Sequence, residues 1–466
     1  MNAIHSLDIA QTIDSQPVRR FQLLVFALCF FCLLADGFDA QALGYVVPAI
    51  SKAWGLKPAS FAPAFSIGLV GMAIGALVLG SLADYVGRRR IIIGCAAVSG
   101  AATLAMAGVS NLTELVALRF VAGCALGGLI PNGLALSSEF SPARWRAVVV
   151  MVTACGISIG SAVGGLAAGT LLAHHGWPIV FQIGGALALV LAVVTALVLP
   201  ESVRFQALRR PGSPKIPALM RRVCPGLAVD AATVFTVLEE KPAGLTVRQL
   251  FAGRRLPKTL LLWVIYFSGL LEIYVFASWL PTVLHRAGVS MAWSVYATSA
   301  LQIAGTVGSL LLGTVLERFN PGRVLTVLYT LGALSVFAIG LSLEQPWMIV
   351  LAACGAGFGI VGGQAGTHAL ASRIYPTFMR STGMGWALGI GRIGSVIGPL
   401  VGGALLARDW PGQDLLAVGA LPALLAAAAA FGLSRLLGRQ NGHHSDEAAA
   451  GDPAVDEDAP VVPARA

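Results

Sequence analysis

Apolar residues run on for about 20 positions at a time along most of this chain, and short clusters of charge, proline and glycine separate the runs. A run such as 179–199 does not alternate between apolar and polar positions, which excludes the strands of a membrane β-barrel. A helix needs roughly 20 apolar residues to cross a bilayer. The pattern therefore predicts twelve spanning helices, at 21–50, 60–82, 91–109, 113–137, 148–173, 178–200, 258–284, 290–315, 324–343, 346–371, 380–406 and 413–437.

One long polar segment divides these helices into two sets of six. It is rich in arginine, as expected of a cytoplasmic linker. We therefore expect an all-α membrane protein built from two six-helix bundles. Its parts are a cytoplasmic N-terminal tail (1–20), a first bundle (21–200), the linker (201–257), a second bundle (258–437) and a polar, disordered cytoplasmic tail (438–466).

The two sets of helices repeat one another in sequence. The segment from Leu136 to Arg146 aligns with that from Leu370 to Arg380, and the same offset pairs Gly128 with Gly362. A six-helix unit has therefore been duplicated. Because six is an even number, both copies start on the same side of the membrane, and the repeats are parallel. Such repeats place a substrate site between them, near the middle of the bilayer.

Composition agrees with a membrane protein and gives its orientation. Hydrophobic residues make up 56% of the chain and charged residues only 11%, which leaves no room for a large soluble domain. The net charge of +9 does not indicate nucleic-acid binding, because the Lys and Arg residues gather in the tails and alternate loops. That asymmetry places both termini in the cytoplasm. The opposite loops carry Lys52, Lys57, Arg286 and Arg408.

The seven cysteines form neither a disulfide framework nor a metal site. Their number is odd, and most lie inside predicted helices. Cys29 and Cys32 share a helical face, but no histidine or further cysteine lies nearby in the sequence. Two such thiols are packing residues, so we expect no metal and no cofactor.

The loop between the second and third helices carries the first functional motif, Gly80-Ser-Leu-Ala-Asp-Tyr-Val-Gly-Arg-Arg-Arg90. It resembles the signature loop of the major facilitator superfamily, and Glu317-Arg318 is its degenerate counterpart in the second half. A carboxylate at a helix end, facing cationic side chains, can hold two helices together in one state of a transport cycle. We therefore interpret Asp84 and Arg88 as gating residues. The alternative is a simple topology anchor.

The first helix carries two aspartates in the motif Asp36-Gly-Phe-Asp39. Their spacing puts both on one helical face. An ionised carboxylate inside the bilayer costs roughly 2.5 kcal/mol or more, so we expect both to face the central cavity rather than lipid. Close carboxylates in a low dielectric cannot both ionise cheaply, so at least one should hold a proton, as a proton carrier must. The alternative is a pair of structural caps around Gly37.

This motif resembles the first helix of the aromatic acid:proton symporters, a family within the same superfamily. The likeness continues through Arg119 to Asn132, Pro200-Glu201-Ser202, Trp279-Leu-Pro281 and Gly391 to Pro399, and it covers roughly residues 20 to 435. The resemblance implies uptake of a benzoate-like or hydroxylated aromatic carboxylate together with protons, in a bacterial inner membrane.

Arg392 is the most informative basic residue, because it lies well inside the eleventh helix and its repeat partner is Ser158. The resemblance and its guanidinium fork point to substrate-carboxylate recognition; the alternative is an internal ion pair. Arg119, nearer the outer end of the fourth helix, is either a gate or an interfacial residue.

Three further titratable residues, two glutamates and a histidine, lie in or beside the predicted helices. Glu272 falls opposite Asp39 in the repeat and is interpreted as a further proton-coupling residue or a partner of Arg392. Glu139 is assigned to a cytoplasmic gate with Arg144 or Arg146. His368, near the inner end of the tenth helix, is expected to be an interfacial hydrogen-bonded residue rather than a titrating one.

An aromatic substrate needs apolar walls and a few polar contacts. Beside Arg392, the residues predicted to bind it are Phe38, Asn132, Tyr274, Gln364 and Trp386.

The sequence therefore predicts a proton-coupled symporter, not an enzyme, that imports an aromatic carboxylate by alternating access. Its partners are the substrate, protons and the bilayer, and a monomer is expected. Two other functions stay open: a transporter of the same fold that carries a non-aromatic organic acid or exports drugs, and a membrane sensor for aromatic acids.

Overall fold

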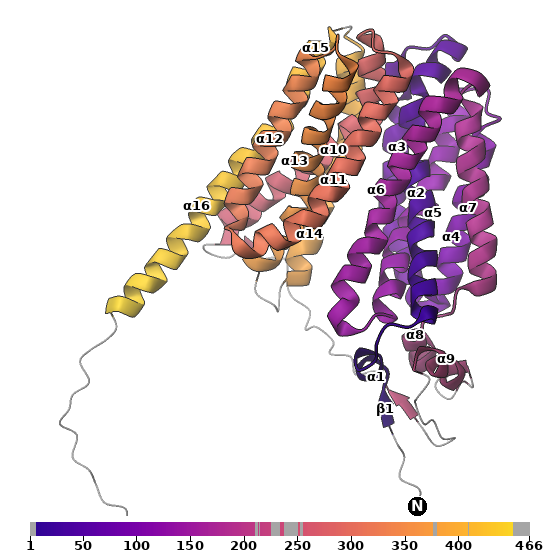
Figure 1. The fold of residues 1–466 in the computed structure, drawn as a ribbon, viewed down its shortest axis with the longest axis vertical. Coiled ribbons are helices and arrows are strands. Elements are labelled where there is room, and N and C mark those ends of the chain that lie inside the picture. The colour runs from indigo at the N-terminus through magenta and orange to yellow at the C-terminus, as the bar shows by residue number, and fades with distance from the viewer. Residues whose placement is uncertain are drawn as a thin grey trace, which may run out of the picture.

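The computed structural model describes residues 6–209, 213, 215–224, 234–236, 250–251, 255–375, 380–408 and 410–450. Nearly all of these residues are helical, and twelve helices are long and apolar enough to cross a membrane. Figure 1 shows the two bundles side by side, with the first in indigo to magenta and the second in orange to yellow. The predicted all-α membrane fold of two six-helix bundles is therefore confirmed.

The first bundle contains six long helices, and the 3-10 turn η1 (Pro58–Phe61) precedes the second of them. Proline at the start of η1 and of the sixth helix suits a first helical turn, where the missing N–H would be unpaired anyway. The helices are α2 (Arg20–Trp54), α3 (Ala62–Val86), α4 (Arg88–Met106), α5 (Leu112–Glu139), α6 (Ala143–His175) and α7 (Pro178–Val198).

The second bundle repeats this order, but its last span is broken in two. The break falls at Ala420, directly before Leu421-Pro422, where proline removes a backbone donor. The sequence predicted this span at 413–437, and the structure has it at Gly412–Leu436, with the break inside it. The helices are α10 (Leu256–Arg286), α11 (Met291–Arg318), α12 (Pro321–Leu341), α13 (Pro346–Ile374), α14 (Arg380–Leu406), α15 (Gly412–Gly419) and α16 (Leu421–Ala450).

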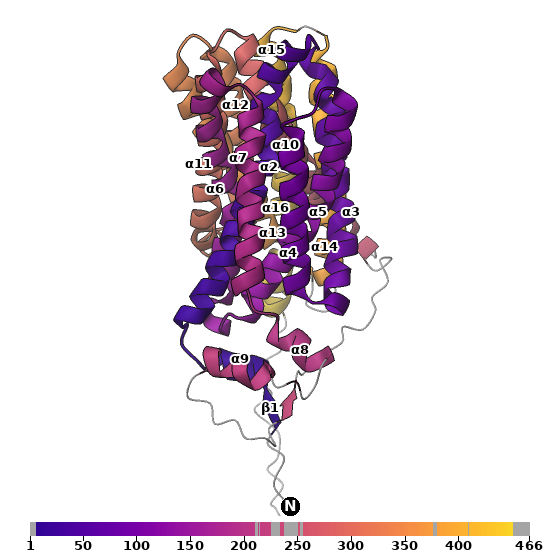
Figure 2. The same ribbon diagram turned by 90° about the vertical axis from the view of Figure 1, so that its right-hand side faces the viewer.

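Short elements gather at one end of the first bundle, which we call the linker end. They are β1 (Ser6–Asp8), α1 (Ile9–Asp14), α8 (Val203–Arg209), α9 (Lys215–Val223) and β2 (Val234–Thr236). The strands β1 and β2 pair in parallel, and Figure 2 shows α8 and α9 directly below the long helices. Of the predicted disordered tail at 438–466, residues up to Ala450 are helical here, and 451–466 lie outside the described residues.

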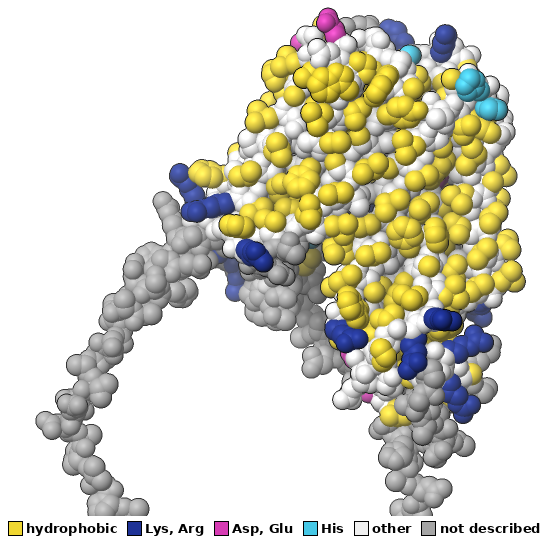
Figure 3. All heavy atoms as spheres, in the orientation of Figure 1, with side chains coloured by type: hydrophobic (Ala, Val, Ile, Leu, Met, Phe, Trp, Pro, Cys, Tyr) yellow, Lys and Arg dark blue, Asp and Glu magenta, His cyan; other side chains and the backbone are white. Residues whose placement is uncertain are grey.

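Glycine lets the helices within each bundle approach closely, as expected where lipid offers no hydrophobic drive for packing. A Cβ at Gly37 of α2 would collide with the Ile157 carbonyl of α6, and one at Gly160 would collide with the Leu34 carbonyl. These glycines therefore bring the backbones of α2 and α6 into direct contact. On the outside, hydrophobic side chains cover much of the face of the helical body that Figure 3 shows.

The two bundles contact each other in the half of the molecule away from the linker end. There the Gln41 side-chain amide donates to the Ala277 carbonyl, and the Ser66 hydroxyl donates to the Val396 carbonyl at 2.8 Å. The Phe65 ring also meets the Trp279 ring edge to face, with centroids 5.1 Å apart. The structure is therefore closed between the bundles at the end opposite the linker.

Candidate functional site: a central cavity and its buried charges

A cavity of about 180 Å³ lies between the two bundles, just beneath this closed region. Seven helices line it, four from the first bundle (α2, α3, α5, α6) and three from the second (α10, α11, α13). Its walls are mainly apolar, and the polar side chains among them are Gln41, Arg119, Ser158, Ser161, Tyr274, Ser278 and Gln302. A mostly apolar site with a few polar groups suits a small aromatic ligand.

Arg119 is the charged residue in the wall of this cavity. It is 5% exposed, so it is not the interfacial residue that the sequence left open. Its Nη1 lies 3.6 Å from Oδ2 of Asp39 and donates to the Asp39 carbonyl at 3.1 Å, while Nη2 donates to the Ala40 carbonyl at 3.4 Å. Arg119 therefore joins the central cavity to a buried carboxylate on α2.

Asp36 and Asp39 do not face the central cavity, contrary to the sequence prediction. Both line a separate space of about 10 Å³ inside the first bundle, between α2, α4, α5 and α7, with room for about one water molecule. The Thr103 hydroxyl donates to Oδ1 of Asp39 at 2.6 Å, whereas both oxygens of Asp36 lack a hydrogen-bond partner among the described residues. The prediction failed because a buried face can also turn toward the interior of its own bundle.

Four polar side chains in the cavity wall make no hydrogen bond within the described part of the chain. Ser158 comes from the first bundle, and Tyr274, Ser278 and Gln302 come from the second. Their donors and acceptors are therefore available to a ligand that spans the cavity from Arg119 to the opposite bundle. Of the residues predicted to bind substrate, Tyr274 is the one that lines this cavity.

Arg392 lies beside the cavity rather than in its wall. Its guanidinium is partly buried, and Nη1 contacts the sulfur of Met72, a wall residue, at 3.5 Å. No carboxylate among the described residues lies within ion-pair distance of it, so the alternative in which it pairs with Glu272 is wrong. Arg392 is therefore a cation next to the cavity that makes no ion pair with the described residues.

Four other predicted substrate contacts lie elsewhere. Phe38 packs on Gly164 and Gly184 inside the first bundle, and the Asn132 amide donates to the Gly128 carbonyl at 2.7 Å. The Gln364 carbonyl oxygen accepts from the Tyr329 hydroxyl inside the second bundle, and Trp386 is exposed and stacks on Trp263. None of the four is among the residues that line the central cavity, and helix assignment alone does not reveal this.

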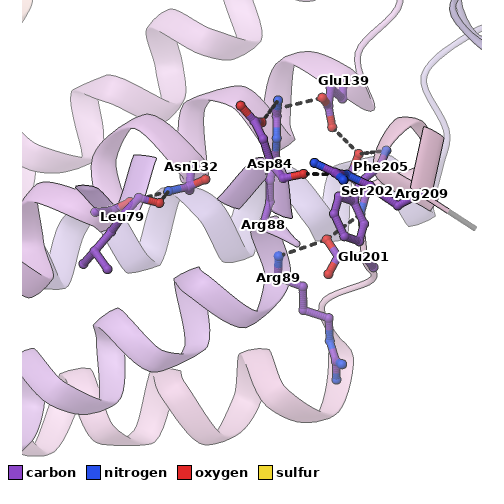
Figure 4. Close-up of polar contacts among 11 residues, drawn as sticks. Leu79, Asp84, Arg88, Arg89, Asn132, Glu139, Glu201, Ser202, Phe205 and Arg209 are labelled. Carbon is purple, nitrogen blue, oxygen red and sulfur yellow. Dashed lines mark hydrogen bonds and ion pairs between the residues drawn. The ribbon is translucent and has the colours of Figure 1, made fainter. Parts of the chain in front are cut away.

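Charged residues form a second site at the linker end, shown in Figure 4. Glu139 of α5 accepts from Arg88 at 2.8 Å and from the Ser202 hydroxyl at 2.5 Å. The Glu201 carboxylate accepts from the Arg89 backbone N–H at 3.1 Å. This cluster fixes the start of the linker to the first turn of α4 and to the end of α5.

The partners at the linker end differ in part from those predicted. Arg88 approaches the exposed Asp84 only to 4.0 Å, so its main partner is Glu139. Arg146, expected beside Glu139, pairs with Asp14 of α1 at 2.7 Å, and Arg144 lies over the Trp145 ring. The repeat counterpart Arg318 is exposed, and the side chain of Glu317 lies outside the described residues. The predicted pair of Asp84 and Arg88 is therefore present, whereas Glu139 pairs with Arg88 and not with Arg144 or Arg146.

We expect Glu139→Gln to loosen the linker from the bundle. The change removes the charge that Arg88 pairs with and weakens the bond to Ser202, so the backbone amides of α8 should exchange with solvent about tenfold faster. Asp14→Asn is the matched control, because its ion pair with Arg146 is half exposed and should contribute less than about 1 kcal/mol. Hydrogen exchange followed by mass spectrometry measures both. Equal exchange of α8 in the two variants would contradict the assignment.

Comparison with known proteins decides the family. Residues 29–399 and 297–463 match the model of the Major Facilitator Superfamily. A gallate transporter of Pseudomonas putida is 40% identical over 91% of this chain and 94% of its own length. A 4-hydroxybenzoate transporter of the same species is 37% identical over 90% and 94%. The chain belongs to the aromatic acid transporter family of the major facilitator superfamily.

This transporter shares its fold with more distant members of the superfamily. A bacterial homologue of the human lysosomal transporter Spinster superposes with a TM-score of 0.70 at 16% identity, covering 90% of this chain and 98% of that one. The xylose transporter of E. coli gives a TM-score of 0.68 at 15% identity. The family model and the curated relatives, together with the twelve apolar helices, show that the chain is a multi-pass membrane transporter and not an enzyme.

Proposed function

We propose that this transporter imports an aromatic carboxylate together with protons by alternating access. The observation that carries the proposal is the shared position of Arg119, in the wall of the central cavity and next to the buried Asp39. The named relatives carry gallate, 4-hydroxybenzoate and benzoate, all of which combine an apolar ring with a carboxylate. Arg119 is the residue in the cavity wall that complements such a carboxylate, because its guanidinium is positively charged and can donate hydrogen bonds to both carboxylate oxygens.

Arg119 also supplies a physical link between proton and substrate. With Asp39 ionised, the guanidinium is neutralised by Asp39, and a second anion would meet a pair with no net charge. A proton on Asp39 removes that competitor and leaves Arg119 as an unpaired cation facing the cavity. Because linkage is reciprocal, bound substrate in turn favours the proton on Asp39. Proton and anion therefore bind together.

Asp36 is the candidate for a second proton. It lies one turn before Asp39 and lines the same small space. One proton with a monoanion moves no net charge, so only the pH gradient would drive uptake. A second proton would add about 2.3 kcal/mol per 100 mV of membrane potential.

Alternating access requires the cavity to open at each end in turn. Contacts between the bundles close the end opposite the linker, which is the state expected for release. We place the linker end and both termini in the cytoplasm of a bacterial inner membrane, because the Lys and Arg residues gather at that end. Arg392, beside the cavity, would then receive the substrate carboxylate as it leaves Arg119.

The proposal is tested by uptake of labelled 4-hydroxybenzoate into cells that produce the transporter. Uptake should concentrate the acid, and a protonophore should abolish that concentration. A panel of benzoate, hydroxybenzoates, gallate and phenylpropionates would then rank the substrates. Accumulation that a protonophore leaves unchanged would contradict proton coupling, and absence of uptake for the whole panel would contradict the substrate class.

Gln302 is expected to favour substrates with ring hydroxyls. It faces the cavity from the bundle opposite Arg119 and makes no side-chain hydrogen bond within the described chain. Gln302→Leu should weaken binding of 4-hydroxybenzoate about fivefold, because a typical hydrogen bond contributes about 1 kcal/mol. Binding of benzoate, which lacks the hydroxyl, should change less than twofold and is the control. Equal losses for the two acids, measured by calorimetry, would contradict the assignment.

A further inference from the structure

A second cavity, of about 260 Å³, lies within the second bundle and is separate from the central one. Helices α10, α14, α15 and α16 surround it, and we call it the C-bundle cavity. It follows α10 from Glu272 to Val283, a rise of about 16 Å. Its walls are leucine, valine, phenylalanine and tryptophan, and Glu272 is the one ionisable residue among the described residues that line it.

Glu272 has no partner of its own. Its exposed fraction is 0%, and neither carboxylate oxygen has a hydrogen-bond partner among the described residues. An ionised carboxylate at that depth costs several kcal/mol unless a cation neutralises it. The cavity therefore presents an acid that lacks a counter-charge.

Comparison of the two repeats shows which partner Glu272 lacks. Glu272 is the repeat counterpart of Asp39, and Asp39 pairs with Arg119. In the second half the position equivalent to Arg119 is Ala353, which is fully buried. In the first bundle, the side chain of Arg119 therefore supplies the cation that pairs with the acid. In the second bundle, the equivalent residue is the uncharged Ala353.

The break between α15 and α16 borders the same cavity. Helix α15 ends at Gly419, and both Val418 and Gly419 line the C-bundle cavity. The Ala420 backbone N–H donates to the last carbonyl groups of α15, and α16 begins at the next residue, so the break adds no charge of its own. Phe276, one turn beyond Glu272, lies 3.2 Å from where a Cβ at Gly419 would stand. The group that favours a cationic ligand in this cavity is therefore Glu272.

The cavity adjoins the lipid-facing surface. Helices α14 and α16 each pack along α10 but have hardly any contact with each other. Val401 and Leu421, on the two sides of this gap, line the cavity and are 41% and 57% exposed. A ligand can therefore enter from the bilayer, without passing through the central cavity.

We propose that the C-bundle cavity binds a lipophilic tertiary ammonium ion that enters from the bilayer. Such an ion has a single N–H group, which donates to the Glu272 carboxylate and leaves no donor unpaired. A primary ammonium ion would bring three donors to a cavity with too few acceptors. The apolar part of the ligand lies along α10 toward Val283. A volume just below that of drug-sized pockets limits it to about a dozen carbon atoms.

The experiment measures binding of radiolabelled N,N-dimethyldecylamine to the full chain in lipid nanodiscs, with empty nanodiscs as the control for partitioning into lipid. A saturable component with one site per chain is expected. Glu272→Gln should weaken it at least tenfold, because the charged hydrogen bond is lost. Leu405→Trp, which fills the cavity, should remove it while binding of 4-hydroxybenzoate to the central cavity persists.

A second measurement avoids reliance on the Glu272 variant. Decyltrimethylammonium has the same charge but no N–H group, and 1-decanol has neither charge nor ammonium. On the unaltered protein both should compete at least tenfold more weakly than the tertiary amine. Equal competition by these compounds, equal affinity of a folded Glu272→Gln variant, or no saturable component would each overturn the proposal. Failure to bind 4-hydroxybenzoate would instead count against the proposed function.

Discussion

Arg119→Gln should lower the affinity for an aromatic carboxylate at least 100-fold. Arg119 is the charged residue in the wall of the central cavity, and it is almost fully buried. Truncating one partner of a buried, hydrogen-bonded charge pair between protein and ligand costs about 2 to 5 kcal/mol of binding free energy or more, and every 1.4 kcal/mol is a tenfold change in affinity. Isothermal titration of the purified transporter with 4-hydroxybenzoate measures the loss.

A double variant separates lost recognition from lost folding. Arg119→Gln alone leaves Asp39 as a buried charge without its cation, which should also lower the melting temperature. The variant Arg119→Gln with Asp39→Asn carries neither charge, so its melting temperature should recover while its affinity stays low. If the double variant bound substrate as tightly as the unaltered protein, Arg119 would not be the carboxylate site, and Arg392 would take its place.

Asp39→Asn should uncouple substrate transport from proton movement. The amide stands in for a protonated carboxyl, so Arg119 stays free for substrate at every pH. In the unaltered protein the affinity should rise as the pH falls, because a proton on Asp39 favours the anion, by the 5- to 150-fold typical of coupled sites. In the variant the affinity should not depend on pH. Exchange of labelled for unlabelled substrate should persist, but a pH gradient should no longer drive accumulation in proteoliposomes.

Two further carboxylates serve as comparisons. Asp36→Asn should also abolish proton-driven accumulation, since Asp36 shares the small space beside Asp39. Glu114→Gln makes the same chemical change at the exposed start of α5 and should leave accumulation intact. Undiminished accumulation in either aspartate variant would contradict its role in proton coupling.

Motifs of several residues at fixed spacing were informative in this chain, whereas single positions on a helix were not. The motifs at Asp36-Gly-Phe-Asp39 and around Asp84 identified the family, because several residue types must occur together at fixed spacing. The role of Arg119 stayed undecided, because depth along a predicted helix does not reveal which neighbour faces it. The hydroxyl of Thr103, which donates to Asp39, carried no sequence signal, since a threonine in an apolar helix is common.

The sequence by itself determined the twelve spans, the duplication and the membrane class, because backbone groups in lipid must pair within a helix and helix length must match the bilayer. It also identified the few charged residues that the orientation of the chain in the membrane does not explain. These are Asp36, Asp39, Glu272 and Arg392. Only the tertiary structure decided where those charges point. A residue on a spanning helix can face lipid, its own bundle or the opposite bundle. The rotation of each helix about its axis decides which, and that rotation depends on packing against all the neighbouring helices and not on any single residue. That rotation turned Asp36 and Asp39 into the first bundle, brought Arg119 to the central cavity and left Glu272 without a cation.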